Sequence, residues 1–239
     1  MNVIEAIDQR RTVRKFLNTP VEWEKVGNIL MAGHYAPSAG NLQTWRFIVI
    51  TDKQQRKSIA DASIKQYWIE DAPVLIIMCS LPQEMERHYG ERGNLYDIQS
   101  CASATQNMLL SAEEFGLKSA WIGAFEENHL KHVLDIPDNA KVHSIIALGY
   151  GDENPPKPQK YHIQDITYIN SWSNKIANVD YVLKNWGGVV KKFSDIAKDE
   201  AKRESKPLIK KIAEKSKEHA EKIKEKASQL SSKIKNKQK

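Results

Sequence analysis

Hydrophobic and polar positions along the chain follow helical spacing in some stretches and strand-like runs in others. Apolar residues three and four positions apart predict a long helix over 97–115 and a short one over 128–134, and residues 53–62 also have a helical pattern. Short, largely apolar runs predict strands over 46–50, 72–79, 117–122 and 142–150. Helices and strands are intermixed without strict alternation, so the pattern favours an α+β sandwich over a doubly wound parallel sheet.

Another helix is predicted to begin near Thr19. Thr19 can cap this helix, Pro20 fits its first position, and Glu22 can close a capping box. Apolar and small residues then recur at helical spacing, at Val26, Ile29, Leu30 and Gly33. Residues 36–41 end the helix in a loop of small residues, because the residue before a proline is biased away from the helix.

Residues 82–94 are polar and aperiodic and contain two glycines. This composition predicts a mobile surface loop or lid. Tyr89 and Arg92 are its candidates for covering a bound ligand.

A basic cluster follows a short amphipathic run over residues 3–7. Arg10, Arg11, Arg14 and Lys15 stand within six positions, with Thr12 among them. Two interpretations remain open. Cations are stabilised at a helix C-terminus without any ligand, so the cluster can be a solvated helix end. Alternatively, guanidinium groups and a hydroxyl form a clamp for the phosphate of a cofactor.

Charge divides the chain into two parts. Residues 1–170 carry 17 Lys and Arg against 21 Asp and Glu, a net charge of −4, whereas residues 171–239 carry 19 against 9, a net charge of +10. An apolar fraction of 41% suffices for a packed core. No apolar stretch has membrane-spanning length and the N-terminus lacks a signal-peptide pattern, so we expect a cytoplasmic protein with a domain over 1–170 and an extension over 171–239.

Several classes of site find no support in the sequence. Neither the G-x-G-x-x-G nor the G-x-x-x-x-G-K-[ST] motif of common nucleotide-binding folds occurs. Cys79 and Cys101 lie in apolar and helical runs, which predicts buried thiols in a reducing compartment. His129 and His132 predict an exposed pair on a helix, and no metal site is expected.

Four segments stand in a recognisable order. They are R-R-T-V-R-K-F at 10–16, A-P-S-A-G-N-L-Q-T-W at 36–45, the helix over 97–116 followed by G-L-K-S-A-W-I-G-A-F, and L-G-Y-G-D-E-N-P-P-K-P at 148–158. Together they resemble the FMN-dependent nitroreductase family. The resemblance covers about residues 1–170 and implies an α+β sandwich with a central, mostly antiparallel sheet flanked by helices.

The resemblance also implies a homodimer with two FMN sites in the subunit interface. Its first motif places the phosphate, ribityl and pyrimidine edge of FMN at Arg10, Arg11, Thr12 and Arg14. A loop contributed by the partner subunit corresponds to Pro37, Ser38 and Asn41, with Gln43 close by as a further cofactor-binding residue. The turn over the isoalloxazine, where a backbone N–H faces N5, corresponds to Ile122, Gly123 and Ala124, and a second phosphate-binding cation corresponds to Lys157.

The implied reaction is hydride transfer from NADH or NADPH through flavin N5 to a small-molecule acceptor such as a nitroaromatic or a quinone, by a ping-pong mechanism. No side chain is nominated as a general acid or base. Arg14 is the candidate to stabilise the negative charge of the reduced flavin near N1 and O2. Specialised enzymes of this fold, which fragment FMN or dehalogenate aromatics, are an alternative.

Two positions depart from the family pattern. Gln159 stands where many members have an arginine, so the other cations of the site are expected to hold a larger share of the phosphate charge. Thr44 stands where a proline commonly precedes the tryptophan. Trp45, Trp68 and Trp121 are predicted to be core or interface residues rather than substrate-stacking ones.

The basic extension carries a thin heptad seam. Small and apolar residues recur three and four positions apart from Ile209 to Ile234, with Lys and Glu between them. A solvated helix, a weak coiled coil with the partner subunit, and a basic arm for anionic membrane or nucleic acid all remain open, as does a non-catalytic scaffold carrying that arm.

Overall fold

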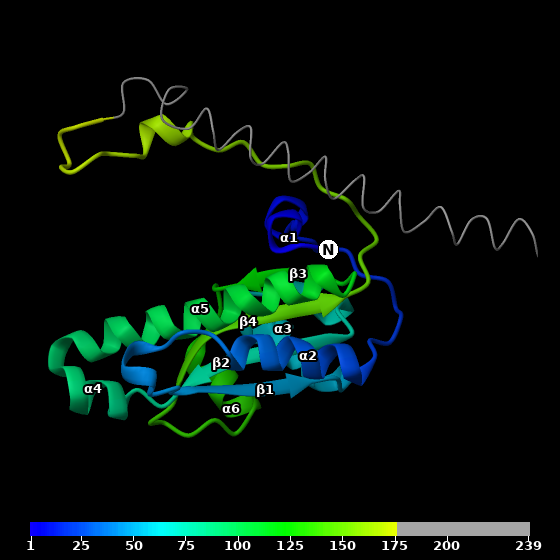
Figure 1. The fold of residues 1–239 in the computed structure, drawn as a ribbon. Helices are drawn as coiled ribbons and strands as arrows, with labels where there is room; N and C mark the ends of the chain where they lie inside the picture. Colours follow the sequence, from blue (N-terminus) through cyan, green and yellow to red (C-terminus); the bar gives the residue numbers. More distant parts are fainter. Residues whose placement is uncertain (176–239) are drawn as a thin grey trace, which may run out of the picture. The chain divides into compact units, whose positions relative to one another are not determined.

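The fold is built on a four-stranded antiparallel sheet (Figure 1). The computed structural model describes Met1–Lys175, and Met1–Gln159 form one compact unit. The strands are β1 (Trp45–Ile50), β2 (Val74–Ser80), β3 (Lys118–Ile122) and β4 (Lys141–Gly149), in the order β1-β2-β4-β3. The predicted α+β class and antiparallel sheet are confirmed, and β1 and β3 form its opposite edges.

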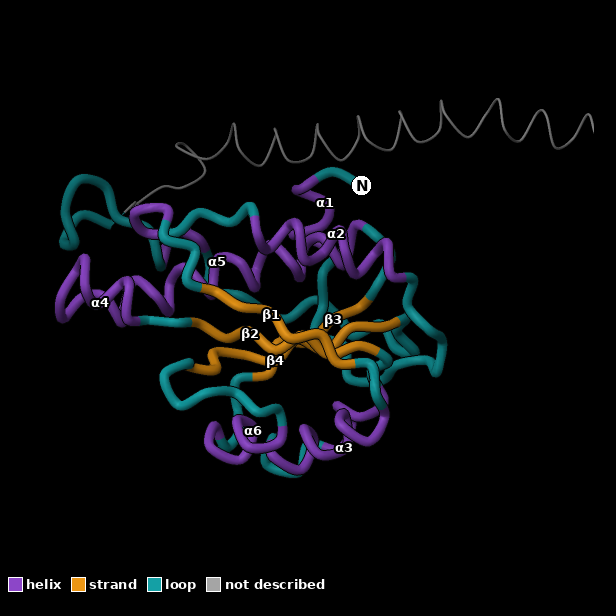
Figure 2. Tube along the Cα trace, turned by 90° about the horizontal axis from the view of Figure 1, so that it is seen from below, coloured by secondary structure: helices purple, strands orange, loops and turns teal. Residues whose placement is uncertain are grey.

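Helices cover both faces of the sheet (Figure 2). One face carries α2 (Trp23–His34) and α5 (Gly93–Glu114), and α1 (Val3–Gln9) packs against α5. The other face carries α3 (Lys53–Ala62) and α6 (Glu127–Val133). Met1–Gln159 therefore form a three-layer sandwich in which the sheet separates two cores.

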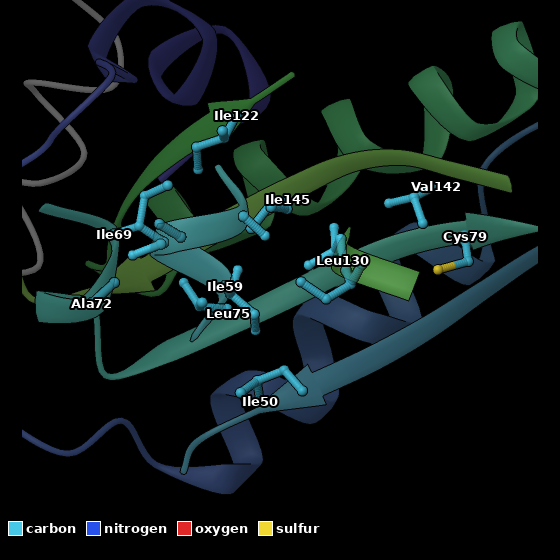
Figure 3. Packing of buried hydrophobic residues seen from close by; sticks show 14 of the residues in the cluster. Ile50, Ile59, Ile69, Ala72, Leu75, Cys79, Ile122, Leu130, Val142 and Ile145 are labelled. Atoms are coloured by element: carbon cyan, nitrogen blue, oxygen red, sulfur yellow. The ribbon is translucent and has the colours of Figure 1, made fainter. Parts of the chain in front are cut away.

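The two cores are divided by the alternation of side chains along β2. Leu75 and Ile77 face the layer of α3 and α6, where they meet Ile59 and Leu130 (Figure 3). Ile76 and its neighbours on the other face pack against the layer of α2 and α5, where the cluster includes Met108. Because both faces are covered, every residue of β2 is buried, which explains why the strand is a continuous apolar run.

The long helix α5 ends as its sequence predicts. Gly116 has a φ of +72°, and its backbone N–H donates to the carbonyl of Glu113 at 3.0 Å. The backbone N–H of Leu117 donates to the carbonyl of Ala112 at 2.9 Å. These two bonds satisfy carbonyls that the helix end leaves free, and the left-handed residue between them is one that glycine adopts without strain.

Two local predictions are wrong. Residues 82–94 are not a loop, because Gln83–Tyr89 form helix α4, followed by the 3₁₀ helix η3 (Gly90–Arg92). Met85 anchors α4 and is fully buried, and one apolar residue is too weak a signal for periodicity analysis.

The start of α2 also differs from the prediction. It begins at Trp23, with Glu22 rather than Thr19 at the N-cap and no capping hydrogen bond from a side chain. The Glu22 carboxylate accepts instead from the Tyr150 hydroxyl, at 2.8 and 2.9 Å. A tertiary contact therefore replaces the predicted capping box.

The remaining described segment, 160–175, contains the 3₁₀ helix η4 (Ile163–Asp165) and stacked rings of Tyr168 and Trp172 with centroids 4.8 Å apart. Within Met1–Lys175, no helix is long and apolar enough to cross a membrane. The predicted seam from Ile209 to Ile234 lies outside the described residues. The predicted domain boundary at 170 stays a prediction.

Candidate functional site

The basic cluster begins at the end of a helix and continues along the edge of the sheet. Helix α1 stops at Gln9, and Arg10 is its C-cap. The chain then runs along the start of edge strand β3, where Thr12 forms a parallel bridge with Ser119 and the N–H of Val13 donates to the Ser119 carbonyl at 3.1 Å. The backbone at Thr12 and Val13 is thus paired with the sheet, Arg10 and Arg11 are partly buried beside it, and Arg14 and Lys15 are exposed.

A small cavity collects three of the predicted phosphate ligands. It has a volume of about 230 Å³ and is lined by Arg10, Arg11 and Thr12 together with Pro155, Pro156 and Pro158. None of these described residues carries a carboxylate. Two guanidinium groups and a hydroxyl in an acid-free cavity form a donor set suited to a phosphate.

A larger neighbouring cavity is lined by acidic as well as basic residues. Its volume is about 840 Å³, and Arg11, Lys118 and Lys157 share its wall with Glu113, Asp152 and Glu153. Lys118 and Glu113 already form an ion pair at 2.6 Å. Carboxylates repel a phosphate, so the smaller cavity is the better fit for the phosphate of a cofactor.

Arg14 does not line the small cavity. Glu153 Oε1 accepts from the backbone N–H groups of Arg14 at 2.6 Å and Lys15 at 3.3 Å. The Arg14 guanidinium lies over the indole of Trp68, 5.7 Å from the ring centroid. The backbone and the side chain of Arg14 therefore contact two different partners, Glu153 and Trp68.

Lys157 is engaged by Asp8. Its ammonium forms an ion pair with the Asp8 carboxylate, and the Arg11 guanidinium donates to the Asp8 carbonyl at 2.6 Å. The hydrogen bond from Lys157 holds the pKa of Asp8 below its ordinary value. Asp8 thus brings Lys157 and Arg11 together beside the small cavity.

The predicted N5-facing turn follows β3. Ile122 is buried at the end of the strand, while Gly123 and Ala124 are exposed. The side-chain amide of Gln66 donates to the Ala124 carbonyl at 3.1 Å. No described atom lies within 4 Å of the position that a Cβ on Gly123 would take, so this face of the turn is open to a ligand.

The predicted partner-facing loop lies at the other edge of the sheet. Pro37, Ser38, Asn41 and Gln43 precede β1, whereas the arginines and the Gly123 turn adjoin β3. The loop is rigidly shaped: Asn41 and Gln43 have φ values of +55° and +48°, and the Ser38 hydroxyl accepts from the Gln43 N–H at 3.2 Å. One chain therefore does not bring the two groups of predicted residues together.

Tyr89 supports this loop. A Cβ on Gly40 would lie 2.6 Å from the Tyr89 hydroxyl, and the Tyr89 ring meets that of Tyr96 edge to face at 5.1 Å. Arg92 lies over the same Tyr96 ring, 5.4 Å from its centroid. Both residues of the predicted lid are thus held by aromatic contacts on α4, η3 and α5.

A buried polar network, absent from the sequence prediction, anchors the same loop. The fully buried Asp97 carboxylate accepts from the Thr44 hydroxyl at 2.6 Å and from the Ser80 hydroxyl at 2.6 Å. His143 Nε2 lies 3.2 Å from this carboxylate and 2.7 Å from Ser80 Oγ. Because the Ser80 hydrogen is donated to Asp97, His143 Nε2 is the donor in its contact with Ser80 Oγ.

Asp97, Cys101 and His143 have potential ligand atoms within 4.8 Å of one another, as a metal site would. Ser80 Oγ bonds to both Asp97 and His143, however, and occupies the space between them. Burial raises the pKa of the Cys101 thiol, which keeps it neutral. The network is therefore a hydrogen-bonded anchor for Thr44 and the loop before it.

The cysteine, histidine and tryptophan residues singled out in the sequence differ in their exposure to solvent. Cys79 and Cys101 are free, buried thiols, and burial raises the pKa of Cys79 to about 11. His129 and His132 are exposed on α6, as predicted. Trp45 is buried in the core, whereas Trp121 is 41% exposed on the edge strand.

Comparison with known proteins identifies the fold. The family model described as the nitroreductase family matches residues 7–70 and 62–150, which include both the arginine cluster and the Gly123 turn. The chain belongs to the nitroreductase family. A relative from Methanothermobacter thermautotrophicus, named for NADH dehydrogenase/NAD(P)H nitroreductase, is 32% identical over 69% of this chain and 87% of its own length.

Solved structures of this family have the same fold. The NADPH:FMN oxidoreductase from Vibrio harveyi, complexed with NAD⁺, superposes with a TM-score of 0.66 at 26% identity, covering 77% of this chain and 83% of its own. An FMN-dependent nitroreductase from Clostridium difficile gives a TM-score of 0.62 at 26% identity and covers 71% and 99%. This nitroreductase therefore shares the architecture of FMN enzymes over most of its described residues.

Proposed function

We propose that this chain is an FMN-dependent NAD(P)H oxidoreductase that reduces a nitroaromatic, a quinone or a similar small acceptor. The observation that carries the proposal is the acid-free cavity lined by Arg10, Arg11 and Thr12. Membership of the nitroreductase family and the names of its relatives support the same cofactor and hydride donor.

Each part of the site has a distinct role. Arg10, Arg11 and Thr12 hold the FMN phosphate, and Lys157 adds a third cation once its pair with Asp8 opens. Arg14 does not line their cavity, so its charge is available to the pyrimidine edge. The Gly123 turn has open space beside it and would offer a backbone N–H to the flavin. Bound FMN would supply the chemistry for hydride transfer between NADH or NADPH and the acceptor, in a ping-pong sequence.

The site is completed by a second copy of the chain. Pro37, Ser38, Asn41 and Gln43 lie at the edge of the sheet opposite the arginines, so a partner subunit is needed to supply them. Apolar side chains that a dimer would cover are exposed on α1 and α5, at Val3, Ile4, Ile7, Leu95 and Ile98. The homodimer has two equivalent sites, each built from both chains.

Mixed dimers test this arrangement. One variant, Arg10→Ala with Arg11→Ala, lacks the phosphate clamp; the other, Ser38→Ala with Asn41→Gly, lacks the loop side chains, and glycine keeps the positive φ of position 41 without strain. Neither homodimer has a complete site. Co-refolding equal amounts is expected to restore about a quarter of the wild-type FMN sites, because half of the dimers are mixed and each has one intact site.

The readouts are flavin absorbance after gel filtration and NADH- or NADPH-driven reduction of a quinone. Activity that returns in the mixture in proportion to bound FMN supports a shared site. A mixture that stays as inactive as its two components contradicts it, as does full FMN binding by a monomer.

A further inference from the structure

One short segment contacts two separate parts of the candidate site. It comprises residues 63–68, which follow α3 and include the start of the 3₁₀ helix η2 (Tyr67–Asp71). The Gln66 amide donates to the Ala124 carbonyl at 3.1 Å and to the Ser63 carbonyl at 2.9 Å. Two residues later, the Trp68 indole lies against the Arg14 guanidinium. Segment 63–68 thus joins the Gly123 turn to the arginine at the pyrimidine edge.

The backbone of this segment is strained. Ile64 and Lys65 have φ values of +55° and +56°, and neither is a glycine. A β-branched residue is particularly unfavourable in the left-handed region. The Ser63 hydroxyl is buried and has no hydrogen-bond partner within the described part of the chain. Such costs persist where the surrounding structure holds a segment in place, and they are often found at functional sites.

We propose that Trp68 is a positioning residue that holds Arg14 at the flavin and thereby raises the reduction potential of bound FMN. This inference rests on the proposed function. The half-buried indole restricts the guanidinium through a cation–π contact, and Gln66 keeps the indole in place by tying segment 63–68 to Ala124. A cation fixed before the reaction stabilises the negative charge of reduced FMN without reorganising.

The test is the midpoint potential of bound FMN in variants of the full chain. Trp68→Met removes the aromatic face but fills similar space. We expect it to weaken the protein's preference for binding reduced over oxidised FMN about tenfold. That change lowers the midpoint potential of bound FMN by about 30 mV. Trp68→Phe keeps an aromatic face and is expected to recover most of the loss. Trp23→Met, at a tryptophan that is 66% exposed on α2, is the matched control and leaves the potential unchanged.

A double-mutant cycle with Arg14→Ala identifies the route of the effect. If Trp68 acts through Arg14, then Trp68→Met added to Arg14→Ala lowers the potential no further. Gln66→Leu is expected to lower the potential less than Trp68→Met does. When it is added to Arg14→Ala, it should cause no further change. It provides the same test should Trp68→Met fail to fold.

The outcomes separate the inference from the proposed function. A wild-type protein that binds no FMN contradicts the proposed function. If the Trp68 variants bind FMN fully but keep the wild-type potential, the proposed role of Trp68 is wrong and the proposed function still stands. An equal drop of potential with and without Arg14 also overturns it, because the indole would then act on the flavin directly.

Discussion

Thr44 shows how a single residue can explain a departure from the family pattern. The sequence resemblance marks this position as one where proline is common, and no reason for threonine is visible from neighbouring residues. In the structure the Thr44 hydroxyl donates to Asp97, 53 positions away. A pattern of residues along the chain does not reveal a pairing across such a distance. The arginine motif at residues 10–14 can be recognised from the sequence because its members are close together in the chain.

The same network makes Asp97 the residue with the clearest effect on stability. Burial by itself raises the pKa of Asp97, but the hydrogen bonds from His143, Ser80 and Thr44 outweigh it and hold the pKa below its ordinary value. Its contribution to folding is therefore complete above the unfolded pKa of about 4 and is lost as the pH falls through the lower folded pKa.

Asp97→Asn is expected to lower the free energy of unfolding by about 2–3 kcal/mol at pH 7, because an amide cannot accept from three donors without leaving one unpaired. Urea unfolding across pH measures the effect. The difference from wild type should shrink below about pH 4. Asp61→Asn, at an exposed carboxylate on α3, is the control and should change stability little. A difference that is constant down to acidic pH would contradict the role of the Asp97 charge.

At the scale of elements, the sequence predicts helices and strands correctly where several apolar residues follow the same periodicity. The predicted bounds of α3 match the structure, and those of the four strands differ by at most two residues. Helix α4 was missed because its burial rests mainly on Met85. The predicted loop over 82–94 is instead a helix whose Tyr89 supports Gly40, so tertiary packing rather than periodicity forms it.

Substitutions of two glycines, one after α5 and one inside α2, are expected to change stability in opposite directions. No described atom lies within 4 Å of a Cβ placed on Gly27 or Gly116, so only the backbone conformation distinguishes them. Gly116→Ala is expected to destabilise the protein by about 1 kcal/mol, because its φ of +72° strains an alanine. Gly27→Ala, inside α2, should stabilise it by about 0.5–1 kcal/mol. Thermal unfolding measures both, and equal signs would refute this interpretation of the α5 end.

At the scale of the whole molecule, strand order determines how the site can be assembled. Resemblance to the family predicted that two subunits share each site, and periodicity alone carries no such information. The order β1-β2-β4-β3 supplies a physical reason, since it separates the Pro37–Gln43 loop from the arginines by the width of the sheet. Trp68 was predicted to be a core or interface residue, and its contact with Arg14 became visible only in the fold.

The central claim is that the cavity of Arg10 and Arg11 binds the FMN phosphate, and a flavin titration tests it most directly. Wild-type protein should quench FMN fluorescence stoichiometrically, and Arg10→Ala with Arg11→Ala should weaken binding at least about 100-fold, since two charge-assisted contacts are lost. Lys15→Ala removes a neighbouring exposed cation that does not line the cavity, and it should bind FMN nearly as wild type does. Equal losses in both variants, or a wild-type protein that takes up no FMN, would contradict the account.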